Sequence, residues 1–517
     1  MNPDEIKSPL PPRKVLIGDE GEVTPIPEAA VPPTEPTGGE SVLFPPQGPT
    51  VTGEGNSSRV SSKIIQKKPF NKKIIFIAIG VAVLGLVIMM LPKIFSGKTD
   101  GNKEVTLNYW GIWEESSVID AVIADFEAQN PGIKIKYTRK DKENYRSILM
   151  SRLQKGQEDT PDIFRIHSTW VPTFQNLLEP VPQTTATNLQ LESDFFDVYK
   201  TELKKKGAYL AIPLMYDGLA LFYNKTMLDA AAVSVPKGWW ELQSAAEKMT
   251  VRDSNGKLQV AGAAIGLTDN IDHWSDVVGL LMKQNGVNPL VDDEENNQKI
   301  QSVLEYYTLF ATKNGGVWDQ SMPNSTDAFT AGKVAFYFGP LWRVYNFAEP
   351  MYKDFKYEVT TVPQLPTIAD IPLDQPLSDA DLTNIHWASY WVEGVAAGSK
   401  HQKEAWKFME FLASKESLEK MYTAASQIRV FGELYPRKSM AEMISSNEKI
   451  RPFISVADNA SGWYLASRTF DAGLNEEMIK YFGDAVNQII TTKDIKNAMI
   501  TLRSGINQLK SRYKLTE

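Results

Sequence analysis

An uncharged run of 18 residues, from Ile74 to Leu91, constrains this chain more than any other feature. A helix of this length and apolar character can cross the hydrocarbon core of a bilayer. Lysines gather on its N-terminal side, at Lys63, Lys67, Lys68, Lys72 and Lys73. Because positive charge favours the cytoplasmic side, we predict a single-pass helix in the cell membrane over residues 74–95, with the N-terminus in the cytoplasm and the rest of the chain extracellular. A cleaved signal peptide is the alternative, but no small-residue cleavage site follows Leu91.

The segment before this run is rich in proline. Twelve of the 31 prolines lie within residues 1–62, where large apolar side chains are few. Such a composition cannot bury enough surface to offset the entropy of ordering the chain. We therefore predict that residues 1–73 form a disordered cytoplasmic tail. Its Pro-Pro pairs favour polyproline II stretches, which either dock on a partner or act as a spacer.

The part after the apolar run is long enough for more than one hydrophobic core, since the chain has 517 residues, 42% of them hydrophobic. Strand patterns at residues 105–110, 133–137 and 163–166 alternate with amphipathic helical patterns. This alternation predicts an α/β fold with a mainly parallel sheet. In such sheets ligands bind beyond the carboxyl ends of the strands, which points to residues 110–114 and 167–170.

A later strand pattern is interrupted by an acidic residue. The apolar stretch that begins at Pro213 breaks at Asp217 and Gly218, and resumes toward Leu228. A carboxylate in the middle of a buried strand needs partners that offset its lost hydration. Asp217 is therefore either a structural residue that caps a turn beside a bulge glycine, or a group that faces a ligand.

This stretch resembles the extracellular solute-binding proteins of the maltose-binding type, in which a strand crosses here from one lobe to the other. The positions that match are Pro213, Asp217, Gly218, Tyr223, Asn224 and Lys225. A second match, a Phe-x-x-Gly-Lys-x-Ala element, consists of Phe329, Gly332, Lys333 and Ala335. In the family a ligand-stacking tryptophan follows this element, and here Trp342 comes one residue late.

The resemblance implies a two-lobe α/β fold of the type II periplasmic-binding-protein kind. It places residues 104–215 and 364–435 in the first lobe, and residues 216–363 and 436–517 in the second. The return crossing between the lobes is expected at Thr360 to Pro366.

The resemblance also implies the function, which is to capture a sugar or oligosaccharide between the lobes and to deliver it to an ABC transporter permease. Sugars present C–H faces that stack on aromatic rings and hydroxyls that bond to carboxylates and other polar groups. The candidate ligand-binding residues are Trp113, Glu114, Ser168, Thr169, Trp170, Tyr216, Asp217, Trp274, Trp342, Trp391 and Trp463.

Several other classes of protein are disfavoured. The chain has no cysteine, so thiolate chemistry, cysteine zinc sites and a lipid-bearing cysteine are excluded. The four histidines are isolated and no glycine-rich phosphate loop is present, so we expect no metal, cofactor or catalytic residue. A net charge of −8 argues against binding of nucleic acid.

Two alternative functions remain open. The same fold could serve as a sensory or adhesive ectodomain. A membrane-anchored glycosidase would need two carboxylates around one bond, which Asp217 could supply together with Glu114 or Glu393.

Overall fold

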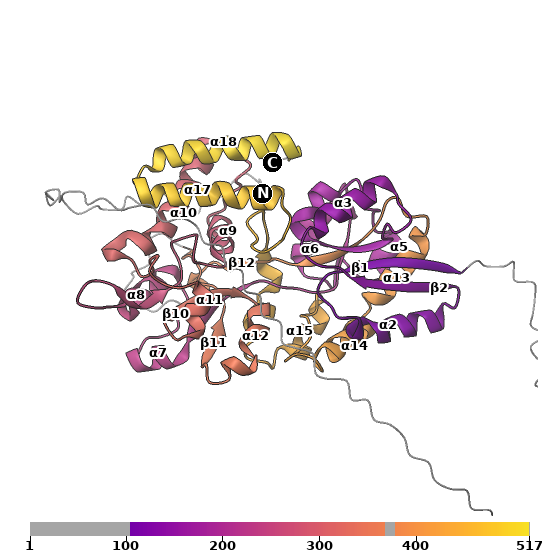
Figure 1. The fold of residues 1–517 in the computed structure, drawn as a ribbon, viewed down its shortest axis with the longest axis horizontal. Helices are drawn as coiled ribbons and strands as arrows, with labels where there is room; N and C mark the ends of the chain where they lie inside the picture. Colours follow the sequence, from indigo (N-terminus) through magenta and orange to yellow (C-terminus); the bar gives the residue numbers. More distant parts are fainter. Residues whose placement is uncertain (1–103, 368–377, 516–517) are drawn as a thin grey trace, which may run out of the picture. The chain divides into compact units, whose positions relative to one another are not determined.

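The computed structural model of the protein describes residues 104–367 and 378–515, which belong to one compact unit (Figure 1). The predicted tail, residues 1–73, and the predicted transmembrane helix, residues 74–95, lie outside this part of the chain. Within the described ranges, no helix combines the length and the apolar character that crossing a bilayer requires.

The first of two large sheets has the strand order β2-β1-β3-β13-β6. Its strands are β1 (Val105–Gly111), β2 (Ile133–Arg139), β3 (Ile163–His167), β6 (Ile212–Pro213) and β13 (Trp391–Val395). β1 is parallel to β2 and β3, whereas β13 is antiparallel to β3 and β6. The three early strands predicted from the sequence are thereby confirmed, and parallel pairing follows because helices connect them. We call the α/β layer around this sheet the first lobe.

The second large sheet has the order β11-β7-β10-β9-β8. Its strands are β7 (Leu219–Asn224), β8 (Val251–Arg252), β9 (Leu258–Ala263), β10 (Val334–Pro340) and β11 (Tyr357–Thr360). β7 runs antiparallel to both of its neighbours, and β10 is parallel to β9. The α/β layer around this sheet is the second lobe. Two short ladders, β4 (Lys204–Lys205) with β5 (Ala208–Tyr209) and β12 (His386–Trp387) with β14 (Ala460–Ser461), complete the pairing.

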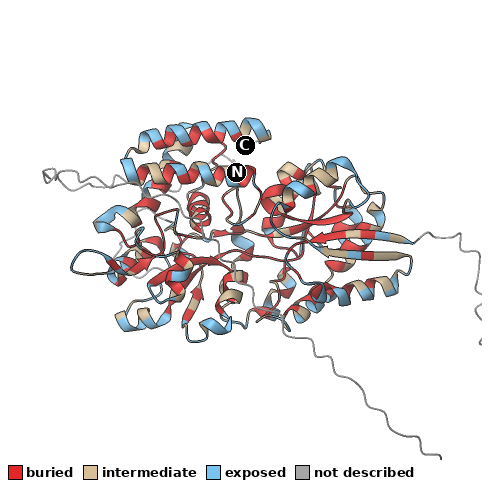
Figure 2. Ribbon diagram, in the orientation of Figure 1, coloured by how far each residue is buried: buried red, intermediate tan, exposed pale blue. Residues whose placement is uncertain are grey.

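Helices cover the sheets because their apolar residues recur every three or four positions. α2, for example, buries Val118, Ile119, Val122 and Phe126 on one face. The α-helices, in chain order, are α2 (Ser116–Gln129), α3 (Tyr145–Lys155), α4 (Val171–Phe174), α5 (Gln183–Asn188), α6 (Asp197–Glu202), α7 (Lys225–Ala231), α8 (Trp239–Met249), α9 (Trp274–Gln284), α10 (Glu294–Thr312), α11 (Ser325–Thr330), α12 (Trp342–Phe347), α13 (Gln402–Leu412), α14 (Lys415–Ala425), α15 (Lys438–Ile444), α16 (Arg451–Ile454), α17 (Leu474–Thr492) and α18 (Ile495–Tyr513). Short 3-10 turns occur at Ser168–Trp170, Lys313–Gly315, Pro350–Tyr352, Asp379–Asp381 and Ala457–Asn459. Figure 2 shows the resulting pattern, with buried strands inside and helices exposed on their outer faces.

Two chain segments cross between the lobes next to each other. Residues 214–218 lead from β6 to β7, and residues 388–390 lead back from β12 to β13. A bridge pairs Gly218 with Ala388, so the two crossings are in direct contact.

The return crossing lies later in the chain than Thr360 to Pro366, where the sequence analysis expected it. Val362 and Trp387 are buried in the core of the second lobe, and Leu365 packs against that core. The chain therefore remains with the second lobe until about Trp387. This packing favours a boundary between the lobes later in the chain than residue 363, where the predicted second lobe is interrupted. The ranges of the lobes stay a prediction.

Candidate ligand-binding site

The first crossing places Asp217 between the lobes. Its neighbour Tyr216 is held by the backbone of Leu434, to whose carbonyl it donates its N–H over 2.9 Å. Gly218 is required for the close approach of the two crossings, because a Cβ there would lie 2.7 Å from the carbonyl oxygen of Trp387. The backbone is thus fixed on both sides of Asp217.

Asp217 is only 8% exposed, and its carboxyl is held in a fixed orientation. Its Oδ1 accepts hydrogen bonds from the backbone N–H of Gly218 at 2.7 Å and of Leu341 at 2.9 Å. Leu341 follows the end of β10, so this second bond ties the crossing to the second lobe. Burial raises the pKa of Asp217 well above its ordinary value, although the two N–H donors oppose the shift. Oδ2 remains for a further hydrogen bond.

A cavity of about 320 Å³ opens above Asp217. Its lining comes from both lobes and consists of Trp113, Lys142, His167, Met215, Asp217, Gly218, Leu219, Asp276, Pro340, Trp342, Tyr345, Trp387, Ser389, Trp391, Arg429, Glu433, Ser467, Arg468 and Phe470. Cavities that bind small molecules commonly have this size and this mixture of aromatic and polar groups.

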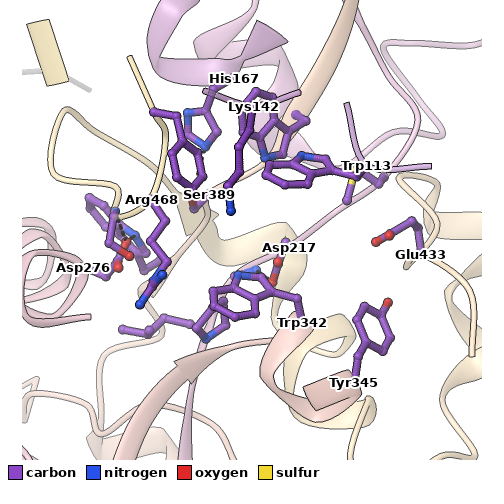
Figure 3. A pocket seen from close by; sticks show the side chains of 18 of the residues that line it. Trp113, Lys142, His167, Asp217, Asp276, Trp342, Tyr345, Ser389, Glu433 and Arg468 are labelled. Carbon is purple, nitrogen blue, oxygen red and sulfur yellow. Dashed lines mark hydrogen bonds between the residues drawn. The ribbon is translucent and has the colours of Figure 1, made fainter. Parts of the chain in front are cut away.

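Aromatic rings form opposite walls of the cavity. In the first lobe, Trp113 meets Trp391 edge to face with their ring centroids 5.5 Å apart. Trp113 keeps 37% of its surface exposed. On the other side Trp342, at the start of α12, lies against the guanidinium of Arg343, 4.4 Å from the ring centroid. Figure 3 shows Trp113 and Trp342 on either side of Asp217.

The polar groups of the cavity are already oriented by the protein. The Nε2 of His167 lies 3.2 Å from the hydroxyl of Ser389, and burial lowers the pKa of this histidine to about 3. His167 is therefore neutral at physiological pH. Arg429 and Glu433 form an ion pair at 2.8 Å on the other side of the cavity.

The carboxylate of Asp276, on α9, finds its polar partners within the second lobe. Its Oδ1 accepts hydrogen bonds from the indole N–H of Trp387 at 2.9 Å and from the backbone N–H of Ser467 at 3.1 Å. Its Oδ2 lies 3.5 Å from Nδ1 of His273.

A loop between β14 and α17 closes one end of the cavity. Three of its residues, Arg468, Phe470 and Ala472, adopt the left-handed backbone conformation, with φ of 57°, 54° and 42°. This conformation costs free energy for residues other than glycine. It is maintained by Asp471, which is 2% exposed and accepts the backbone N–H groups of three later residues, Gly473, Asn475 and Glu476. The loop is thus a rigid wall rather than a loose segment.

Comparison with known proteins identifies the class. A family model described as bacterial extracellular solute-binding protein matches residues 121–451. The chain belongs to this family.

Individual members of the solute-binding family are only distantly similar. The multiple sugar-binding protein of Streptococcus mutans is 24% identical over 209 residues, a match that covers 40% of this chain and 48% of that protein. The chain therefore spans about half the length of this relative.

Solved structures share the fold of this solute-binding protein. The GacH receptor of Streptomyces glaucescens, whose structures include a complex with acarbose, has a TM-score of 0.58 at 21% identity, with 79% of this chain and 99% of that chain covered. The sugar-binding protein MalE of Xanthomonas citri has a TM-score of 0.62 at 17% identity, with 79% and 98% covered. The two-lobe α/β fold of the periplasmic-binding-protein type that the sequence resemblance implied is confirmed.

Four of the residues expected at the ligand site line the cavity of this solute-binding protein, namely Trp113, Asp217, Trp342 and Trp391. They come from two strand ends, a crossing and a turn, which are the places that the α/β rule and the family pattern indicated.

Other expected residues lie behind the cavity in the first lobe. Ser168, Thr169 and Trp170 are buried, and Trp170 stacks on Phe174 with centroids 6.1 Å apart. Tyr216 is also buried, with its ring against Phe196. Thr169 contributes indirectly, since its hydroxyl lies 2.9 Å from Nδ1 of His167.

Glu114 lies behind the cavity for an electrostatic reason. It forms an ion pair with Arg165, and the same guanidinium binds Glu393 at 2.6 Å. Arg165 is buried within β3, so it draws both carboxylates into the first lobe.

Two expected tryptophans pack in the second lobe without lining the cavity. Trp274 lies against α17, where a Cβ at Gly483 would come within 3.2 Å of its ring. Trp463 packs against Tyr464 and Phe482, with centroids 5.3 Å and 6.2 Å away.

Sequence reasoning missed several residues of the cavity. They are Lys142, His167, Asp276, Tyr345, Trp387, Ser389, Arg429, Glu433, Arg468 and Phe470. The strand-end rule indicates residues 167–170 and therefore His167, although His167 is not among the candidate ligand-binding residues. Ser389 lies shortly before β13, at the same edge of the sheet. Arg429, Glu433, Arg468 and Phe470 lie in connections whose position depends on tertiary packing, and no sequence pattern marked them.

Proposed function

We propose that this chain is a membrane-anchored extracellular receptor that captures a sugar or oligosaccharide between its lobes and delivers it to an ABC transporter permease. One observation carries the proposal. Aromatic rings from the two lobes, Trp113 and Trp342, stand on either side of the carboxyl of Asp217 in one cavity. A sugar ring offers the complementary surface, since its C–H faces stack on indole and its hydroxyls donate hydrogen bonds to a carboxyl oxygen.

The arrangement of the crossings supports capture by closure. The lobes are joined at Gly218 and Ala388, and the cavity lies beside this joint. Hinge motions of this kind need backbone changes at only a few positions. A ligand that contacts both lobes favours the closed arrangement because it gains contacts there.

Membrane attachment rests on the sequence. The uncharged run from Ile74 to Leu91, preceded by lysines, supports an anchor that leaves the family domain outside the cell. The absence of cysteine supports this form of attachment, because a lipid-bearing cysteine is not available.

The glycosidase alternative loses the carboxylate pairs on which it was based. Glu114 and Glu393 are both bound to Arg165, and Glu393 is 0% exposed. Neither lines the cavity with Asp217. This placement supports binding over hydrolysis, and product analysis by chromatography tests it directly.

A thermal-shift assay of the full-length protein against a saccharide panel tests the proposal. A bound solute stabilises the native state by about 2.7 kcal/mol at about a hundredfold excess over Kd, so binders should raise the melting temperature. Trp342→Ala should abolish or weaken the response. Trp463→Ala, a change in another partly buried tryptophan of the second lobe, should retain it. If no saccharide stabilises the wild-type protein, the proposed function is wrong.

The anchor is tested by topology. Protease added outside intact cells should remove the lobes and leave the residues before Ile74 protected. A mature protein that begins after Leu91 would contradict an uncleaved anchor.

A further inference from the structure

The cavity is electrically asymmetric. In Figure 3 Lys142 and Arg468 lie to the left of Asp217, and Glu433 lies to its right. The carboxylate of Glu433 is paired with Arg429, so that side carries balanced charge. On the side of Lys142 and Arg468 the positive charges are not balanced in this way.

The ammonium of Lys142 has no carboxylate partner among residues 104–367 and 378–515. It lies 5.0 Å from the ring centroid of Phe470, in the loop that closes the cavity. Lys142 is exposed, and Figure 3 shows it extending into the cavity from the side of Trp113. A lysine in this position can accept an anionic ligand group without breaking an existing ion pair.

Arg468 adds to the positive charge on the same side, because it shares its partner. The carboxylate of Asp272 binds the guanidinium of Arg468 at 2.8 Å and that of Arg343 at 2.7 Å. One negative charge therefore serves two positive charges. The side chain of Arg468 is 45% exposed and lines the cavity, so part of its donor capacity faces the ligand space.

When Asp217 is left out because it lies between the two sides, the charged groups on this side have one positive charge in excess. Lys142, Arg343 and Arg468 stand against Asp272 and Asp276, and the last of these is held by Trp387, Ser467 and His273. The excess occurs in a chain whose net charge is −8, so it is not a general property of the protein. A cavity edge that keeps an unpaired cation beside stacking rings is suited to a ring that carries an anion.

We propose that the solute is an acidic saccharide, which places a hydroxyl on Asp217 and a carboxylate between Lys142 and Arg468. This assignment rests on the proposed function and names the substrate class of the same site. One surplus positive charge matches a singly charged uronate better than a doubly charged sugar phosphate. The rigid loop that contains Arg468 and Phe470 then acts as the specificity-determining wall.

Matched pairs of disaccharides that differ only in oxidation at C6 test this inference. Glucose, galactose and mannose disaccharides are compared with the corresponding uronates by calorimetry on the full-length protein. At least one uronate should bind about tenfold or more tightly than its neutral counterpart, the effect of one hydrogen bond between charged groups. This advantage should shrink as ionic strength increases.

Lys142→Gln should remove most of the advantage, so that the uronate and its neutral counterpart bind with similar affinity. Lys136→Gln removes the same charge from an exposed position that does not line the cavity, and it should leave the advantage intact. Arg468→Gln should act in the same direction as Lys142→Gln.

Each remaining outcome overturns the inference in a distinct way. Neutral disaccharides that bind as tightly as the uronates would overturn the acidic class while the sugar-binding function stands. If a sugar 6-phosphate binds more tightly than the uronate, the anionic group of the ligand is not a carboxylate and the inference is wrong. If no saccharide binds, both the inference and the proposed function fail.

Discussion

Two clusters of buried charge lie within the same solute-binding domain and differ in whether their carboxyl groups have a cationic partner. In the first lobe Arg165 binds Glu114 and Glu393, and Tyr109 donates its hydroxyl to Glu393 at 3.0 Å. Between the lobes, the Oδ1 atom of Asp217 is fixed by two backbone N–H groups, and the carboxyl borders an open cavity.

This difference distinguishes carboxylates that maintain the structure of the first lobe from a carboxyl that can contact a ligand. The carboxylates around Arg165 share a cationic partner and do not line the cavity, so they contribute to the integrity of the lobe. Asp217 has no cationic partner among the described residues, and its pKa is raised by burial. Burying a carboxyl without a cationic partner costs free energy unless a ligand completes its hydrogen bonds. Three predictions test this distinction, in order of decreasing effect.

The largest effect is expected for Arg165→Met. Removing the guanidinium leaves Glu114 and Glu393 buried without a cation, which should lower the free energy of unfolding by about 3–5 kcal/mol. Chemical denaturation measures this change. Lys134→Met, which breaks a partly exposed ion pair with Glu127, should cost about 0–1 kcal/mol. If the two variants lose the same free energy of unfolding, the buried cluster does not contribute more to stability than an ordinary ion pair.

A smaller effect, on affinity instead of stability, is expected for Asp217→Asn. The amide keeps the size of the carboxyl but removes a charged acceptor, so binding of the saccharide should weaken by about 1.5–3 kcal/mol, or about ten- to a hundredfold. The variant should still fold, so that the loss of affinity is not a loss of the native structure. Calorimetry with Asp229→Asn, an exposed change on α7, provides the control. Undiminished affinity would remove Asp217 from the site.

The smallest effect concerns pH, and its sign differs between Asp217 and Glu114. The raised pKa of Asp217 gives stability that is complete below the ordinary carboxyl pKa of about 4 and is lost as pH rises through the folded-state value. For Glu114, burial opposes ionisation, but Arg165 holds the pKa below its ordinary value. Its contribution is present above that ordinary value and is lost as pH falls through the lowered pKa.

Unfolding measured between acid and neutral pH should reveal these opposite signs. The stability of the wild type relative to Asp217→Asn should fall as pH rises, by at most about 1.4 kcal/mol per pH unit. Relative to Glu114→Gln it should rise with pH and then become constant above the ordinary carboxyl pKa. If the two curves have the same slope, the contrast between Asp217 and Glu114 is wrong.

The sequence predicted the features that depend on local pattern. Alternation of strands and helices indicated an α/β fold, and the family pattern around Asp217 indicated two lobes. Trp113 and Trp391 lie at the same edge of the sheet, because β1 is parallel to β3 and β13 is antiparallel to β3.

The remaining errors come from long-range pairing. Glu114 follows a strand end, as a ligand contact would, but Arg165, on the neighbouring strand, binds it instead. An arginine inside the apolar stretch Ile163–His167 was the available signal, since a buried cation requires an acidic partner. Arg429 and Phe470 reach the cavity through folding of segments far from Asp217 in the chain, which no local pattern encodes.

The contact at Gly218 has a mechanical consequence. A single hydrogen on this residue sets the separation of the two crossing segments, because the carbonyl of Trp387 leaves no room for a methyl group. Rotation about a pivot displaces distant atoms more than near ones, so a small spacer at Gly218 would move the far edges of the lobes much further than the crossings themselves. The resting angle between the lobes can therefore change through one residue that touches the joint, while the ligand-facing side chains keep their identities.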